Sequence, residues 1–399
     1  MSISIVLFDN FEERANLLPL VATRPIGNLR IGALTINQKW KVLSSQDVSY
    51  LTVDYLQEKF PCNPLQPVII LVNACILPTK DLLETFLNLE FNCNLVDEQG
   101  KWLAVKVMKE DFLLLQQRKR LDYPETCLIG DIPRIKYLED VFLLNEKQIA
   151  VDIEHLKLQK SVFIDYQNSI FYGDDLYLHD SIQFEQVTLD TRTGPVYVEE
   201  DVIIEPGVII KGPAYIGKGS RLKSGTVIYP NVTIGPNCTI SGELNNTVIW
   251  GNSSKGHYGY LGCAVIGEGC NLGAGTSNSN LKNDWSEVKV YNYQSNDFRN
   301  TGLLKCGVFI GDHSMLAISS KINTGTVIGV GAQIAMSNFI PKFVSDFSWI
   351  TDAKSESYMF TKFIEMLTRK AQIKKENLTA EDKEIFEYIY RQKESLRNY

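Results

Sequence analysis

The chain has 399 residues, 44% of them hydrophobic and 22% charged, a composition typical of a globular protein with room for two or three domains. Its net charge of -7 and pI near 5.4 argue against a nucleic-acid-binding protein, which needs a basic face. No stretch approaches the ~18 apolar residues of a membrane span. The opening MSISIVLFDNFEER turns acidic too soon for a secretory signal, and the eight cysteines form no CxxC pair. We therefore expect a reduced, cytoplasmic protein with no metal site and no membrane partner.

Residues 1–174 predict a Rossmann-like α/β domain. The segment from Ile3 to Phe8 is a short apolar strand, and the run from Pro67 to Val72 predicts a strand covered on both faces. Thr79 is well placed to cap a following helix, and residues 101–108 predict a further strand.

Residues 175–337 predict a parallel β-helix, because aliphatic side chains recur every six residues and neither a helix nor a plain strand has that period. Small residues follow four positions after each of the first seven aliphatic ones. The aliphatic row is Val198, Ile204, Ile210, Ile216, Leu222, Ile228, Ile234 and Ile240, and the small row is Val202, Val208, Ala214, Ser220, Thr226, Val232 and Cys238. The phase shifts between Ile240 and Ile266, and a second break spans residues 278–306. Such interruptions usually protrude as loops that carry binding residues.

Residues 338–399 predict a helical cap. Phe360, Phe363, Ile364 and Leu367 follow a helical period, and the segment from Thr379 to Asp382 forms a potential capping box before a second helix. We expect both helices to cover the last exposed edge of the β-helix.

His257 falls in the first interruption, within a stretch dense in glycine, asparagine and serine. Glycines allow a backbone to approach a ligand closely. An imidazole can act as a base near pH 7. On the residues alone, a functional histidine and an ordinary surface histidine are equally supported.

The stretch KGHYGYLGCAVIGEGCNLGAGTSNSNLKN resembles the acetyltransferase half of the bifunctional GlmU-type enzymes, which make UDP-N-acetylglucosamine. The resemblance implies a left-handed parallel β-helix, acetyl-CoA as cosubstrate and active sites between the subunits of a homotrimer. It implies that His257 is the catalytic base, supported by Asn280. It further implies that Tyr260 and Asn271 line the sugar site and that the backbone N–H of Ala274 lies near the acetyl carbonyl.

The chain departs from that family at several positions. Leu281 replaces a tyrosine, and Asn245 aligns with a lysine that binds the sugar phosphate. A further family lysine corresponds to Lys289, although an insertion at 290–306 makes the alignment less exact there. The acetyl acceptor could therefore differ from glucosamine-1-phosphate. His313 has no counterpart in the family and is expected to be structural.

The N-terminal half resembles sugar nucleotidyltransferases more faintly, through LLPLVATRPIGNLRIGALTINQKW, with Arg24 and Arg30 as candidate phosphate contacts. The whole chain resembles a bacterial GlmU-like family that joins such a domain to a hexapeptide solenoid. The glycine-rich phosphate loop is missing, although Arg14 survives in place. The residues near Asn73 lack the metal-binding aspartate, so Mg²⁺ is expected only if this domain is active.

Three functions remain open. The first is an acetyl-CoA-dependent N-acetyltransferase that acts on an amino-sugar phosphate or a nucleotide sugar. The second is a sugar-1-phosphate nucleotidyltransferase, forming UDP- or dTDP-sugars, whose β-helix serves trimerisation. The third is a non-catalytic scaffold that binds sugar nucleotides.

Overall fold

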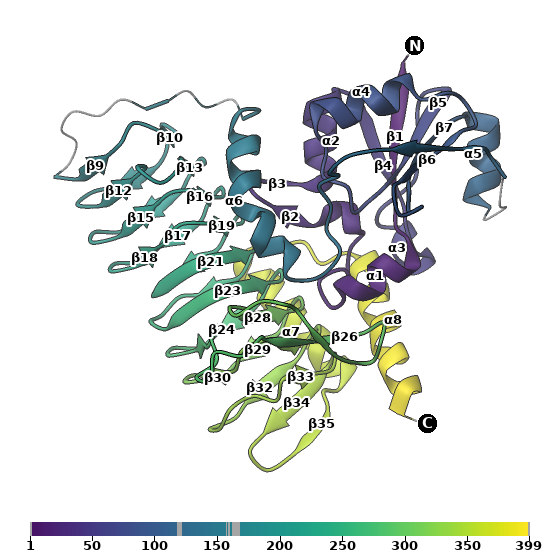
Figure 1. Ribbon diagram of the computed structural model, residues 1–399. Coiled ribbons are helices and arrows are strands. Elements are labelled where there is room, and N and C mark those ends of the chain that lie inside the picture. Colours follow the sequence, from purple (N-terminus) through teal and green to yellow (C-terminus); the bar gives the residue numbers. More distant parts are fainter. Residues whose placement is uncertain (1, 118–121, 157, 159, 162–167, 398–399) are drawn as a thin grey trace. The chain divides into compact units, whose positions relative to one another are not determined.

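The computed structural model describes residues 2–117, 122–156, 158, 160–161 and 168–397. The chain forms two compact units (Figure 1). The first comprises Met1–Leu17, Thr23–Leu29 and Leu34–Tyr137, and the second comprises Leu18–Ala22, Arg30–Ala33 and Leu138–Tyr399.

The first unit is built on a mixed sheet of six strands. In spatial order they are β4 (Asp47–Leu51), β1 (Ile3–Phe8), β5 (Val68–Asn73), β7 (Trp102–Met108), β6 (Asn94–Asp97) and β8 (Glu125–Leu128). β1 pairs in parallel with β4 and β5, whereas β7 runs antiparallel to β5 and β6. All residues of β5 are buried, which confirms the strand predicted from the apolar run. The predicted strands at the N-terminus and at residues 101–108 are confirmed as β1 and β7.

Short helices flank this sheet. They are α1 (Phe11–Leu17), α2 (Ile36–Ser44), α3 (Asp54–Gln57), α4 (Lys80–Asn88) and α5 (Lys109–Gln116), with a 3₁₀ turn η1 at Ile26–Asn28. The Thr79 hydroxyl accepts the N–H of Leu82 at 3.2 Å, so the predicted cap of α4 is confirmed. Phe86 of α4 stacks on Trp40 of α2, with ring centroids 5.7 Å apart.

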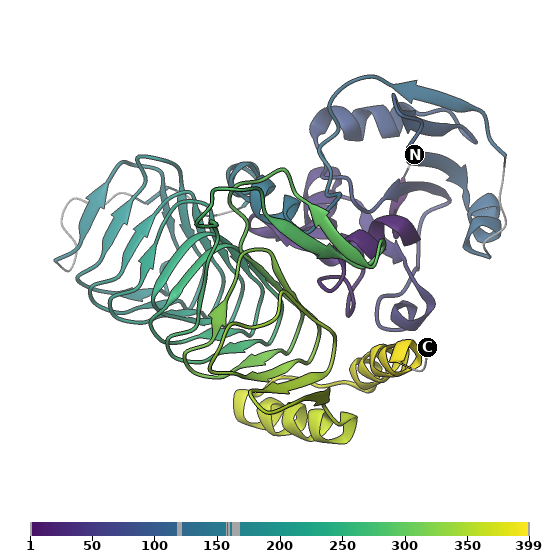
Figure 2. The same ribbon diagram turned by 60° about the horizontal axis from the view of Figure 1, so that its bottom comes forward.

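The second unit is a parallel β-helix whose coils form three ladders (Figure 2). The first ladder contains β10 (Leu176–Leu178), β13 (Val196–Val198), β16 (Ala214–Ile216), β19 (Val232–Ile234), β21 (Glu243–Ile249), β23 (Tyr260–Ile266), β28 (Val308–Ile310), β31 (Thr326–Ile328) and β33 (Phe343–Val344). The second contains β9 (Ile170–Tyr172), β12 (Thr188–Asp190), β15 (Ile209–Lys211) and β18 (Val227–Ile228), and shares the long strand β21 with the first. β25 (Ser277–Asn278) and β30 (Lys321–Ile322) form a separate parallel pair.

The third ladder runs the length of the stack. It contains β11 (Gln183–Phe184), β14 (Ile203–Ile204), β17 (Arg221–Leu222), β20 (Thr239–Ile240), β22 (Ser254–Lys255), β24 (Asn271–Leu272), β29 (Met315–Leu316), β32 (Gln333–Ala335) and β34 (Ser348–Thr351). β35 (Ser355–Ser357) pairs antiparallel with β34 and ends the ladder.

The six-residue repeat is confirmed, because every aliphatic and small residue of the two predicted rows is buried. The aliphatic side chains stack in register from coil to coil, as Ile204, Leu222 and Ile240 do. Each buried aliphatic side chain contributes roughly 1.5–3 kcal/mol of burial free energy. The stack therefore supplies its own continuous core.

The β-helix extends beyond the range of 175–337 predicted from the repeat. Parallel pairing begins at β9, which pairs with β12, and continues to β34, which pairs with β32. Helix α6 (Asp140–Ile153) also belongs to the second unit and packs against strands of the first ladder. Its Asn145 side chain donates to the Asn231 side chain at 2.8 Å and accepts from the Thr233 hydroxyl at 2.9 Å.

The second interruption protrudes as an antiparallel hairpin of β26 (Lys289–Asn292) and β27 (Asp297–Asn300). Arg299 in this hairpin forms an ion pair of 2.6 Å with Glu139, which immediately precedes α6. The ring of Tyr291 stacks on Phe343 of β33, with centroids 3.6 Å apart. The hairpin is therefore anchored at both sides.

The two C-terminal helices are confirmed as α7 (Phe360–Lys374) and α8 (Ala380–Arg397), with the predicted capping box between Thr379 and Asp382. The contacts of α7 extend beyond the last edge of the β-helix. α7 runs along the side of several coils, because Lys374 donates to Ser254 of β22 at 3.4 Å while Phe363 packs on Phe347 beside the last coil. His313 packs edge-on against Phe386 of α8.

No helix among the described residues is both long enough and apolar enough to cross a membrane.

Candidate active site

His257 lies in a short loop, residues 256–259, that joins β22 to β23 and is called the His257 loop below. The side chains of His257 and Tyr258 are exposed, whereas the preceding Lys255 is buried. Gly259 has a φ of +130°, and a Cβ atom there would lie 2.2 Å from the carbonyl oxygen of Thr276. The loop therefore requires glycine at its end.

The backbone of the His257 loop is held at every carbonyl. Two carbonyl oxygens accept from lysine side chains: that of Gly256 from Lys223 Nζ at 3.0 Å, and that of His257 from Lys255 Nζ at 2.7 Å. The other two accept from backbone N–H groups: that of Tyr258 from Gly275, and that of Gly259 from Glu243, both at 3.0 Å. Two of these donors are lysine ammonium groups, whose hydrogen bonds are stronger than those of neutral donors. The loop therefore presents an exposed imidazole on a fixed backbone.

Tyr260 and Asn280 are brought together across the coil. The Asn280 side-chain amide donates to the Tyr260 hydroxyl oxygen at 3.3 Å and approaches the Cys263 sulfur at 3.5 Å. Burial raises the pKa of the Tyr260 hydroxyl, and the hydrogen bond from Asn280 opposes that rise. The hydroxyl therefore stays protonated at neutral pH.

The other predicted residues on the β-helix lie farther apart. Asn271 is exposed on β24, in the coil after the His257 loop. Ala274 follows in the next turn, where its carbonyl oxygen accepts the Ser319 N–H at 2.6 Å. Lys289 is exposed at the base of the protruding hairpin, and its carbonyl oxygen accepts from Lys342 Nζ. Among the described residues, no hydrogen bond or ion pair joins Lys289 to the Tyr260–Asn280 pair.

Lys255 was missed by the sequence reasoning. It is 1% exposed and stands in register with Ile240, within the row of aliphatic residues that fills the β-helix. Desolvation lowers the pKa of its ammonium group to about 8. The signal in the sequence is the spacing: 15 positions separate residues 240 and 255 instead of the usual 18, so the six-residue count no longer finds the interior position.

The candidate phosphate contacts of the N-terminal half fall in both units, Arg14 and Arg24 in the first and Arg30 in the second. Arg14 is 5% exposed, forms a 2.9 Å ion pair with Asp9 and donates to the carbonyl oxygen of Arg24 and the hydroxyl of Tyr55. Burial raises the pKa of Asp9, although Arg14 opposes the rise. Arg30 belongs to the second unit, where its carbonyl oxygen accepts from Trp250. The guanidinium of Arg14 thus binds residues of its own unit.

At its end, β5 carries an amide side chain and not the aspartate of a metal site. Asn73 stands there, and its amide donates to both carboxylate oxygens of Glu13, at 2.9 and 3.1 Å. Burial raises the pKa of Glu13, which favours its neutral form. Across the described residues, no group of three or more His, Cys, Asp and Glu side chains could hold a metal ion. These side chains therefore do not fit a Mg²⁺ site of the kind that phosphoryl transfer uses.

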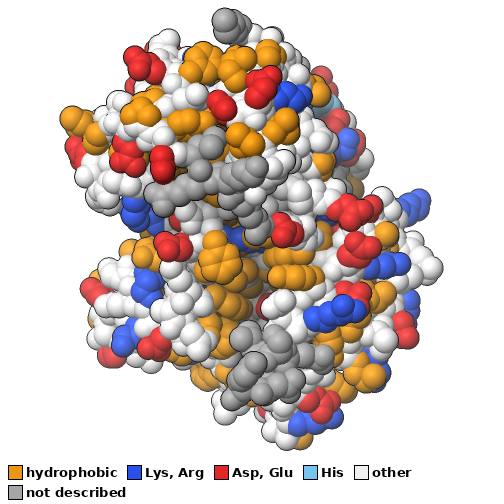
Figure 3. Space-filling model, turned by 90° about the vertical axis from the view of Figure 1, so that its right-hand side faces the viewer, with side chains coloured by type: hydrophobic (Ala, Val, Ile, Leu, Met, Phe, Trp, Pro, Cys, Tyr) orange, Lys and Arg blue, Asp and Glu red, His pale blue; other side chains and the backbone are white. Residues whose placement is uncertain are grey.

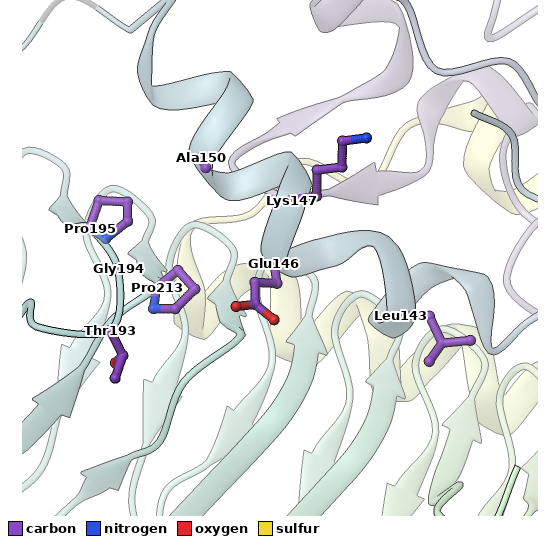
Figure 4. Close-up of a pocket in the computed structure, with 8 residues that line it drawn as sticks. All are labelled: Leu143, Glu146, Lys147, Ala150, Thr193, Gly194, Pro195 and Pro213. Carbon is purple, nitrogen blue, oxygen red and sulfur yellow. The ribbon is translucent and has the colours of Figure 1, made fainter. Parts of the chain in front are cut away.

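A pocket of about 380 Å³ lies elsewhere on the second unit, between α6 and two turns of the β-helix (Figure 4). Its walls are formed by Leu143, Glu146, Lys147, Ala150, Thr193, Gly194, Pro195 and Pro213. The Glu146 side chain points toward Pro213, whereas Lys147 points to the other side of the helix. The pocket contains none of the predicted site residues. On the molecular face in Figure 3, Lys and Arg side chains are dispersed among Asp and Glu.

Comparison with known proteins identifies the two parts of the chain. Residues 5–161 match the family of sugar nucleotidyl transferases, and residues 195–229 match the bacterial transferase hexapeptide family with its six repeats. The chain thus joins a segment that matches sugar nucleotidyl transferases to a β-helix with hexapeptide repeats.

The curated relatives are bifunctional transferases of the GlmU type. The chain is 24% identical to the bifunctional protein GlmU of Clostridium kluyveri over 243 residues, which cover 60% of this chain and 49% of the relative. It is 24% identical to the bifunctional protein GlmU of Methanocaldococcus jannaschii over 74% of this chain and 76% of the relative. It is 39% identical to a bifunctional sugar-1-phosphate nucleotidylyltransferase/acetyltransferase of Sulfurisphaera tokodaii over 35% of each chain. The match thus spans about half the length of the Clostridium relative.

Proposed function

We propose that the chain is an acetyl-CoA-dependent N-acetyltransferase that acts on an amino-sugar phosphate or a nucleotide sugar, with His257 as its general base. The observation that carries this proposal is the exposed imidazole on a loop that is held at all four carbonyls and leads directly into β23, the strand that carries Tyr260. Fixed placement of a base is what acid–base catalysis requires.

The chemistry needs an amine, a thioester and a base. His257 takes a proton from the sugar ammonium group or from the nitrogen as it attacks, and the C–N bond forms at the acetyl carbonyl carbon. The C–S bond then breaks, and the thiolate of coenzyme A leaves and takes up a proton. The backbone N–H of Ala274 is our candidate to stabilise the oxyanion between these steps.

The sugar would be bound by side chains on the neighbouring coils. Tyr260 accepts from Asn280 and can donate its own O–H to a sugar hydroxyl, and Asn271 faces solvent one coil further on. Lys289 is the candidate for the phosphate, and it would reach the ligand from the hairpin. Because Asn245 stands where the resemblance implies a phosphate-binding lysine, the acceptor need not be glucosamine-1-phosphate.

A second candidate function is sugar-1-phosphate nucleotidyl transfer, which the match of residues 5–161 favours. Arg14 and Asp9 form an ion pair with each other, and Glu13 accepts a hydrogen bond from Asn73. Because these side chains are already bonded within the protein, we infer that this site has lost the activity. A scaffold that binds sugar nucleotides without reacting is the third candidate.

Purified protein should be assayed for thiol release from acetyl-CoA with amino-sugar phosphates and amino nucleotide sugars, each matched with its hydroxyl analogue. Thiol release that depends on the amine supports the acetyltransferase. Magnesium-dependent release of pyrophosphate without amine-dependent thiol release would favour the nucleotidyltransferase instead.

A further inference from the structure

Lys255 is a charged residue in a row that otherwise holds apolar side chains. Ile204, Leu222 and Ile240 precede it in register, and Leu272 occupies the next strand of the same ladder. A buried cation is costly unless its donors are satisfied, and an aliphatic residue would fill this row without that cost. Its presence therefore calls for a role beyond packing.

The ammonium group reaches the corner of the coil, where it binds two backbone carbonyls. Nζ donates to Ser241 O at 3.2 Å and to His257 O at 2.7 Å. Gly242 leaves the space for it, since a Cβ atom there would lie 3.0 Å from Nζ. One of the two acceptors thus belongs to the histidine that the proposed function assigns as the base.

We propose that Lys255 is a positioning residue that fixes the His257 loop through the carbonyl of His257. This inference rests on the proposed function, because it concerns the presentation of its base. A lysine stem spans the apolar interior, and the ammonium group ties the coil of Ser241 to the loop. Lys223, which donates to the adjacent carbonyl of Gly256, holds the same loop from outside the core.

The test compares two substitutions at this position. Lys255→Leu restores the aliphatic row and removes the donors, whereas Lys255→Gln keeps two N–H donors on a shorter side chain. We expect hydrogen–deuterium exchange over residues 256–260 to be about tenfold faster in Lys255→Leu, and kcat for acetyl transfer to fall about 10- to 100-fold. Lys255→Gln should recover part of both. Lys255→Met serves if the leucine variant does not fold.

The matched control is Lys321→Met, which removes an exposed lysine that donates to Ser337 O at 3.0 Å in a later coil. It should leave exchange over residues 256–260 and kcat unchanged. Unchanged exchange in Lys255→Leu, or a Lys255→Gln variant no better than it, would overturn the proposal and leave Lys255 as a space filler. If the parent protein shows no acetyl transfer, the proposed function fails, while the exchange measurement still decides whether Lys255 holds the loop.

Discussion

At the scale of single residues, the candidate site depends on contacts that leave the reacting group exposed. The His257 loop is fixed through its carbonyls, and the Tyr260 hydroxyl is fixed by Asn280, which lies 20 positions away in the sequence. The His257 imidazole is exposed to solvent, whereas the Tyr260 hydroxyl is partly buried. This is the geometry expected of a site that is completed by its ligand.

Gly262 keeps the Tyr260–Asn280 pair in place. A Cβ atom at Gly262 would lie 2.2 Å from the Tyr260 hydroxyl and 2.7 Å from the Asn280 amide nitrogen. Gly262→Ala should therefore displace both side-chain ends and raise KM for the amino sugar about tenfold, while the melting temperature changes little because the displaced atoms belong to side chains and not to the backbone. Steady-state kinetics with parallel thermal melting tests this. A variant with parental KM would show that the pair does not contact the sugar.

Asp346 gives the second unit a defined pH dependence. Desolvation raises the pKa of this carboxyl to about 6, against the opposing hydrogen bond from the Val330 N–H and the charge of Lys393. The folded state therefore holds a proton more tightly than the unfolded state, so this group's contribution to stability falls as the pH rises from about 4 to 6. The loss amounts to roughly 2–3 kcal/mol.

Asp346→Asn should remove that loss, because the amide oxygen can still accept from Val330. The melting temperature of the variant relative to that of the parent should rise between pH 4 and pH 7. The control is Asp352→Asn, since the pKa of the exposed Asp352 is lowered by the Ser337 N–H and no such gain is expected. Parallel melting curves for the parent and Asp346→Asn across this range would contradict the assignment.

At the scale of elements, α7 is fastened to the side of the β-helix by aromatic packing. Phe363 is fully buried, with its ring 4.9 Å from that of Phe347 and 5.2 Å from that of Phe386. Phe363→Ala should destabilise the second unit by about 3–5 kcal/mol, the usual cost of truncating a buried aromatic residue. Ile373→Ala on the same helix is the control, because Ile373 is 82% exposed. Denaturant unfolding measures both, and equal stabilities would mean that α7 is not docked as described.

The sequence predicts which segments form helices and strands better than it predicts which of these elements pack together. The coil interior follows from the six-residue period, because each aliphatic residue must point inward for the rows to stack. The six-residue count did not identify Lys255 as an interior residue, because only 15 positions separate it from Ile240 instead of the usual 18. The apolar stripe of α7, with Phe363 and Leu367, predicts that the helix is buried on one side but cannot say against which coils. Tyr260 and Asn280 entered as separate site residues through the resemblance, which placed Asn280 beside His257. The bond between Asn280 and Tyr260 could not be derived from spacing alone.

At the scale of the whole molecule, we propose a homotrimer. Parallel β-helices offer flat faces to copies of themselves, and closed symmetry is the rule for such assemblies. Light scattering at micromolar concentration should give the mass of three chains of 45.1 kDa each. A stable monomer would contradict this and would require the site to function within one chain.

The acetyltransferase account is tested most directly by His257→Ala. Thiol release from acetyl-CoA with the preferred amino sugar should fall by about 10²–10⁴-fold, the loss expected for a general base, while the melting temperature and the KM for acetyl-CoA remain those of the parent. His179→Ala is the matched control, since that imidazole bonds Ser181 in an early coil and should leave turnover unchanged. Full turnover in a well-folded His257→Ala protein would contradict the account.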